Sequence, residues 1–197
     1  MGEPLKPSKP LNIGIVGAGK ISGAYLSTLE RLTSLRLTAV TDLDPGRARA
    51  VADQAPGGAE VAVVPSVAAL VARDDVDAVL NLTIPAAHAD VALAALRAGK
   101  HVYGEKPLAA DREEADAVLA AAREAGLRVG CAPDTVLGTG TQTARKAVDD
   151  GLIGRPVAAT AFMTGAGHET QHDDGVLAAR EEDHRALELT RHLTEDV

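Results

Sequence analysis

The sequence predicts an α/β protein with a doubly wound parallel sheet, followed by an incomplete α/β stub. Runs rich in β-forming residues alternate with helical segments between residues 11 and 132, a pattern typical of parallel strands joined by helices that cover both faces. A glycine-rich turn directly follows the first run, and the regular alternation ends near residue 133. Together these observations indicate a Rossmann-type sheet in the first two thirds of the chain.

The first strand and helix lie on either side of the glycine-rich turn. Leu11–Val16 is a short apolar run that predicts a strand, and apolar residues recur at helical spacing between Ile21 and Leu32. Leu35–Thr41 alternates and is rich in β-forming residues, so it predicts the second strand.

Capping residues mark the starts of the later helices. Asp44 stands directly before a proline, and an N-cap carboxylate followed by proline at the first helical position favours a helix start. Ser66 and Asp111 also precede helical segments. The predicted helices cover residues 44–55, 66–72, 85–97 and 111–125, and the remaining predicted strands cover residues 60–64, 76–83, 101–104 and 127–132.

The rhythm of the sequence changes at Pro133. Gly138–Asp150 predicts an amphipathic helix and Val157–Met163 a strand, whereas the end of the chain is highly charged and has no clear strand. The predicted organisation is a flexible N-terminal arm over residues 1–10, a dinucleotide-binding domain over 11–133, the start of a second domain over 134–172 and an atypical charged tail over 173–197.

Composition and charge restrict the partners of the chain. Hydrophobic residues make up 46% of its 197 residues, which is enough for a sizeable core. The net charge of −8 argues against nucleic acid, because a phosphate backbone needs a basic face. No apolar run approaches the roughly 18 residues of a membrane span, and residues 1–10 lack the apolar stretch of a signal peptide. We therefore expect a cytoplasmic protein that binds neither nucleic acid nor membrane.

The glycine-rich turn, Gly17-Ala18-Gly19-Lys20, indicates dinucleotide binding. Gly17 permits a tight turn, and Gly19 lacks the Cβ that would keep a pyrophosphate from the backbone. The following helix would offer free N–H groups and the positive end of its dipole. The alternative is a purely structural turn.

Asp42 ends the second predicted strand, 23 residues after Gly19. A carboxylate at this place can accept hydrogen bonds from the adenosine ribose hydroxyls and would repel a 2′-phosphate, which favours NAD. Arg47 is close enough in sequence to leave NADP possible. The alternative is that Asp42 only begins a turn with Asp44.

Two further clusters follow the later strands. Thr83, Pro85 and His88 come after the fourth predicted strand, and Glu105 and Lys106 after the fifth. The carboxyl ends of parallel strands line the ligand crevice of such a sheet. A lysine there could stabilise a developing alkoxide or tune an acid–base group. The alternatives are an ordinary surface or capping histidine and a solvated Glu–Lys ion pair.

In this order, the three clusters resemble the Gfo/Idh/MocA oxidoreductase family. The resemblance covers residues 11–172, through NIGIVGAGKIS, AVTDLDPGRA, NLTIPAAHADVALAALRAGKHVYGEKPLA and APDTVLGTGTQTARKAVDDGLIGRP, and Glu105-Lys106-Pro107 is its hallmark. The family joins a Rossmann domain to an α/β domain whose open sheet commonly serves as a dimer face. It oxidises or reduces a hydroxyl-bearing carbon of sugars, inositols or related polyols with a nicotinamide cofactor.

The resemblance implies roles for individual residues. Glu105 would sit beside the nicotinamide, and Lys106 would be the catalytic residue at the reacting substrate oxygen. The residues implied to line the cofactor site are Gly17, Gly19, Lys20, Ile21, Asp42, Thr83, Pro85 and His88. The expected cofactor is NAD, with NADP possible, the expected substrate a small polyol or sugar, and an oligomer is possible for full-length relatives.

The chain departs from the family pattern near its end. The family's second domain continues much further and carries an Asp-x-x-x-His pair, whose histidine is the acid–base partner of the lysine. GHETQH at residues 167–172 still resembles a family segment, but no such pair follows it. We therefore expect a truncated member for which the missing histidine argues against independent activity. The alternative is a non-catalytic dinucleotide-binding or interaction module.

One hypothesis is that a frameshift produced the charged tail. If GC-rich codons are assumed for residues 179–184, another reading frame gives a Pro-Gly-Gly-Gly-Pro stretch, similar to a glycine-rich segment of the family. Chance is the rival explanation, since consecutive glutamates readily give glycines. No metal site is predicted, because Gly165 and Gly167 oppose a helix that would align His168 with His172. The single cysteine, Cys131, is expected to be a small core residue.

Overall fold

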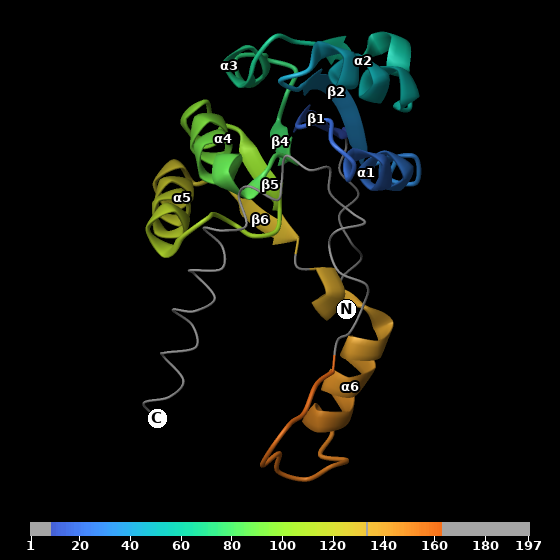
Figure 1. Ribbon diagram of the computed structural model, residues 1–197, viewed down its shortest axis with the longest axis vertical. Coiled ribbons are helices and arrows are strands. Elements are labelled where there is room, and N and C mark those ends of the chain that lie inside the picture. Colours follow the sequence, from blue (N-terminus) through green and yellow to red (C-terminus); the bar gives the residue numbers. More distant parts are fainter. Residues whose placement is uncertain (1–8, 133, 163–197) are drawn as a thin grey trace. The chain divides into compact units, whose positions relative to one another are not determined.

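The computed structural model describes residues 9–132 and 134–162 (Figure 1). The chain divides into two compact units between Thr143 and Ala144. None of the described helices is both long and apolar enough to cross a membrane.

A parallel sheet forms the centre of the first unit. Its strands run in the order β3-β2-β1-β4-β5-β6, and all neighbouring strands are parallel. The strands are β1 (Leu11–Val16), β2 (Leu35–Thr41), β3 (Ala62–Val63), β4 (Ala78–Asn81), β5 (His101–Glu105) and β6 (Val129–Ala132). The order reverses between β1 and β4, which is the switch point of a doubly wound sheet. The predicted fold class is confirmed.

Helices cover both faces of this sheet. The helices of the first unit are α1 (Ser22–Leu29), α2 (Pro45–Gln54), α3 (Val67–Val71), α4 (Pro85–Arg97) and α5 (Arg112–Ala125), and α6 (Thr139–Asp149) crosses into the second unit. Ile15 packs in a cluster with side chains of α1 and α2, and Val16 in a second cluster with side chains of α3, α4 and α5. Because consecutive strand residues point to opposite faces, the two clusters lie on either side of the sheet. Figure 1 shows α1 and α2 apart from α4 and α5.

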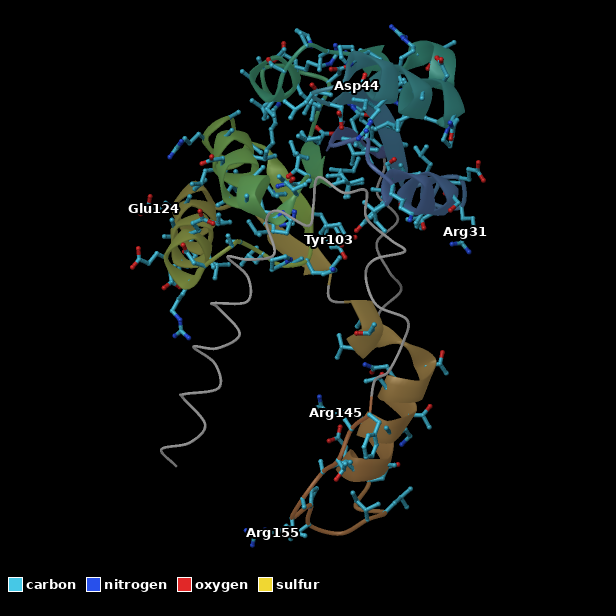
Figure 2. All side chains as sticks on the ribbon, in the orientation of Figure 1. Arg31, Asp44, Tyr103, Glu124, Arg145 and Arg155 are labelled. Carbon is cyan, nitrogen blue, oxygen red and sulfur yellow. The ribbon has the colours of Figure 1, made fainter. Side chains whose placement is uncertain are left out.

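The predicted caps hold three helices at their starts. The Asp44 carboxylate accepts from the Gly46 N–H at 2.7 Å, the Ser66 hydroxyl accepts from the Ala69 N–H at 3.1 Å, and the Asp111 carboxylate accepts from the Glu114 N–H at 2.8 Å. Each bond satisfies an N–H that the helix itself leaves unpaired. On the outer surface, charged side chains such as Glu124 on α5 and Arg31 after α1 point away from the sheet (Figure 2).

An ion pair lies between α3 and β4. The Arg73 guanidinium donates to both carboxylate oxygens of Asp75, at 2.8 and 2.7 Å. These hydrogen bonds lower the pKa of Asp75 and raise that of Arg73. Both side chains are partly exposed, so the pair contributes little to stability.

The predicted strand over residues 157–163 is wrong for the residues that the structure describes. Residues 157–162 form no strand and are exposed, and Met163 lies outside the described residues. The run has β-forming residues, but a strand persists only when another strand satisfies its backbone groups, and none of the described strands pairs with it. The predicted helix over residues 138–150 is confirmed as α6.

Candidate functional site

The loop between β1 and α1 lies at the carboxyl edge of the sheet. Gly17 has a φ of +97° and donates its N–H to the Thr41 carbonyl at 2.9 Å. A Cβ on Gly17 would lie 2.6 Å from the Leu82 carbonyl oxygen. The turn therefore fits closely between the ends of β2 and β4, and only glycine suits it.

Gly19 differs from Gly17 in its surroundings. A Cβ built on Gly19 would meet no atom within 4 Å, so the fold itself leaves that space open. The Ser22 hydroxyl donates to the Gly19 carbonyl at 2.7 Å and fixes the loop where α1 begins. Lys20 and Ile21 are exposed beside it. An open backbone at a helix start can hold a phosphate, so the loop fits the pyrophosphate of a dinucleotide.

Asp42 connects the end of β2 to this loop. Its Oδ2 accepts from the Ala18 N–H at 2.6 Å, and its Oδ1 accepts from the Asp44 N–H at 2.8 Å. The turn with Asp44 that sequence reasoning offered as an alternative is therefore present. A carboxylate has about four acceptor positions, so the half-buried Asp42 retains capacity for ribose hydroxyls.

Asn81, at the end of β4, is a residue that sequence reasoning missed. It is 2% exposed, and its Nδ2 donates to the His88 carbonyl at 3.0 Å. Its Oδ1 accepts from the Thr83 hydroxyl at 2.6 Å, which orients the turn before α4. Pro85 occupies the first position of α4 and is exposed. A polar residue that ends an apolar strand was the available signal for Asn81.

The imidazole of His88 lies beneath the loops after β4 and β5. The residue is 2% exposed, so it does not face an open crevice as expected, nor is it a surface histidine. Its Nδ1 is 2.5 Å from the Pro107 carbonyl oxygen, and its Nε2 is 3.0 Å from the Thr83 carbonyl oxygen. Carbonyl oxygens only accept, so each contact is a hydrogen bond when that nitrogen carries a proton. His88 thus connects the two loops.

Glu105 and Lys106 follow one another where β5 ends. The Glu105 carboxylate accepts from the Tyr25 hydroxyl at 2.6 Å and from the Lys106 N–H at 3.2 Å. The alternative of a Glu–Lys ion pair is not formed, because no salt bridge joins the two side chains. The Lys106 side chain is exposed, and its ammonium makes no hydrogen bond within the described part of the chain. Tyr25 is one of the apolar residues at helical spacing between Ile21 and Leu32, and that spacing does not predict this contact.

The predicted site residues therefore gather at one edge of the sheet. Gly17 and Gly19 follow β1, Asp42 follows β2, and the Thr83 and Glu105 clusters lie at the ends of β4 and β5. They surround the β1–β4 switch point, where open α/β sheets bind ligands. Among the described residues, no group of three or more His, Cys, Asp or Glu side chains could hold a metal ion; His168 and His172 lie outside them.

The fold and the loops at this edge are typical of dinucleotide-binding α/β proteins. Residues 11–132 match the family model GFO_IDH_MocA, described as an oxidoreductase family with an NAD-binding Rossmann fold. The chain therefore belongs to the Gfo/Idh/MocA oxidoreductases, as its motifs predicted. The match also confirms a nicotinamide dinucleotide as the cofactor.

Relatives named for an enzymatic activity are slightly more than one third identical to the chain over the aligned segment. It is 37% identical over 149 residues to the 1,5-anhydro-D-fructose reductase of Ensifer adhaerens, covering 76% of this chain and 44% of that protein. It is 36% identical over 151 residues to inositol 2-dehydrogenase 3 of Saccharopolyspora erythraea, with 76% and 44% covered.

A solved structure also matches most of the chain. KijD10, a 3-ketoreductase from Actinomadura kijaniata in complex with NADP, matches with a TM-score of 0.66 and 34% identity, covering 74% of this chain and 46% of that chain. The chain thus spans less than half the length of these proteins.

Proposed function

We propose that the chain carries the cofactor half of an NAD(P)-dependent oxidoreductase that acts on a hydroxyl of a sugar, an inositol or a similar polyol. The observation that carries the proposal is the placement of the open Gly19 backbone and the exposed Lys106 ammonium at one edge of the sheet. The first can take a pyrophosphate, and the second can meet the oxygen of a substrate. The names of the relatives, an anhydrofructose reductase and an inositol dehydrogenase, support the substrate class.

The predicted site residues would have separate roles in binding the cofactor and the substrate. Gly17, Gly19 and the start of α1 with Lys20 and Ile21 would bind the pyrophosphate, and Asp42 would accept from the adenosine ribose. Thr83, Pro85 and Glu105 would border the cofactor, while His88 would hold their loops in place. The nicotinamide, when bound, supplies hydride transfer to or from the carbinol carbon. Lys106 would hold the substrate oxygen and stabilise negative charge that develops on it.

Titration with NADH and a dehydrogenase screen against inositols and sugars test this function. We expect micromolar NADH binding by calorimetry. In Lys106→Met, we expect turnover to fall by at least about tenfold while the NADH dissociation constant stays within about threefold, because the ammonium acts on the reacting oxygen. Binding without turnover in the unchanged chain would support the non-catalytic module instead. Absence of NADH binding would refute both.

Asp42 is expected to set the preference between NADH and NADPH. Asp42→Asn keeps a carbonyl oxygen for the Ala18 N–H and removes the charge that repels a 2′-phosphate, while its amide NH2 no longer accepts from the Asp44 N–H. We expect the ratio of NADH to NADPH affinity to fall by about tenfold, roughly 1.4 kcal/mol. Competition titrations measure the ratio, with Asp53→Asn on the exposed side of α2 as a matched control. An unchanged ratio would mean that Asp42 serves only the turn.

A further inference from the structure

A hydrogen bond crosses the switch point of the sheet. The Tyr25 hydroxyl, on α1, donates to Glu105 Oε1, at the end of β5, over 2.6 Å. The two residues are 80 positions apart in the sequence. Helix α1 follows β1, and β4 lies between β1 and β5 in the sheet. The distance is that of a charge-assisted O–H···O⁻ bond. It joins the helix that begins at the glycine loop to the loop that carries Lys106.

The Glu105 carboxylate is held at both of its oxygens. Oε1 accepts from Tyr25, and Oε2 accepts from the Lys106 backbone N–H at 3.2 Å. The Glu105 carbonyl also accepts from the Cys131 thiol at 3.7 Å, which ties the same residue to β6. The backbone from which the Lys106 side chain extends is therefore fixed through the carboxylate that Tyr25 orients.

Tyr25 lies near the end of α1 that would bind the phosphate. The helix begins at Ser22, directly after the glycine loop, and Tyr25 lies within its first turn. Its ring packs against the core cluster beneath α1, so the ring moves with the helix. A displacement of α1 when a phosphate binds at its start would reach Glu105 through a single hydrogen bond.

We propose that Tyr25 is a positioning residue: its hydroxyl couples the phosphate-binding end of α1 to the Glu105 carboxylate and so sets the place of Lys106. The inference rests on the proposed function, because it assigns Lys106 to the reacting oxygen. It assigns Tyr25 no contact with the substrate. The matched comparison is Tyr103, on β5, which is 43% exposed and makes no hydroxyl hydrogen bond within the described part of the chain.

Fluorine NMR can test this coupling, because the chain has few tyrosines. The chain has two tyrosines and no tryptophan, so 3-fluorotyrosine labelling gives two ¹⁹F resonances, and Tyr103→Phe leaves only that of Tyr25. We expect the Tyr25 resonance to move on NADH addition. In Glu105→Gln we expect it to be displaced before any cofactor is added. This readout needs no turnover, and a tyrosine without a contact to Glu105 would not respond to the Glu105→Gln exchange.

Kinetics provide the second arm. Tyr25→Phe keeps the packed ring and removes only the hydroxyl. If the unchanged chain turns over substrate, we expect kcat to fall by about fivefold while KM and the NADH dissociation constant stay within about twofold. Tyr103→Phe is expected to change none of them. If NADH binds but the Tyr25 resonance stays in place, the inference is wrong and the proposed function stands. If NADH does not bind at all, the proposed function fails and the inference fails with it.

Discussion

Gly19→Val is expected to leave the protein folded and to remove most of its dinucleotide binding. A Cβ at Gly19 meets no protein atom within 4 Å, so the substitution creates no clash inside the fold. The added isopropyl group would instead fill the space where a pyrophosphate must approach the backbone. We expect the NADH dissociation constant to rise by at least about 100-fold, roughly 2.7 kcal/mol, and the free energy of unfolding to change by less than about 1 kcal/mol. Calorimetric titration and urea unfolding measure the two quantities.

Two other glycines serve as controls for this result. Gly17→Val should destabilise the fold by about 3 kcal/mol or more, because its Cβ would lie 2.6 Å from the Leu82 carbonyl oxygen at a φ of +97°. Gly140→Val, where the space is also open, should leave NADH binding unchanged. Retention of normal NADH affinity in Gly19→Val would show that the loop is a structural turn.

His88→Ala is expected to have the largest effect on stability among the polar residues of the site. The ring is 2% exposed and faces the carbonyl oxygens of Thr83 and Pro107. Its removal would leave a cavity and unpaired carbonyl groups, which together cost about 2–4 kcal/mol. We expect the urea midpoint to fall accordingly and NADH affinity to weaken, because the loops after β4 and β5 lose their common anchor.

The histidine at the opposite edge of the sheet provides the comparison. His101 is only half-buried, and its Nδ1 accepts one hydrogen bond, from the Arg128 N–H at 3.0 Å. His101→Ala should therefore cost less than about 1 kcal/mol. Equal urea midpoints for His88→Ala and the unchanged protein would contradict the role of His88 as the link between the loops.

The sequence alone predicts those structural features that depend on contacts between residues close together in the chain. Asp44 and Asp111 each bond to an N–H two or three residues away, so their identity alone predicts a helix start. Gly17 and Gly19 were recognisable because a strand, a turn and a helix follow one another directly.

Contacts between distant segments could not be predicted in this way. Helical spacing put Tyr25 on an apolar face, but only the folded sheet brings its hydroxyl to Glu105. The contact of His88 with Pro107 likewise depends on the loop after β5, which lies 19 residues further along the chain. The run after residue 156 failed as a strand for a related reason, since its β-forming residues cannot specify a partner.

The double engagement of Asp42 has a consequence for redesign of cofactor preference. The group that would discriminate between cofactors also accepts the Ala18 N–H of the phosphate loop. An exchange that deletes its oxygen atoms would alter selectivity and loosen the loop in one step, which is a trade-off between specificity and stability. A route to NADPH use therefore needs a residue at this position that retains a short acceptor, such as serine or asparagine, and a second substitution that introduces a cation elsewhere. A change of cofactor preference at Asp42 would therefore also change the geometry of the loop.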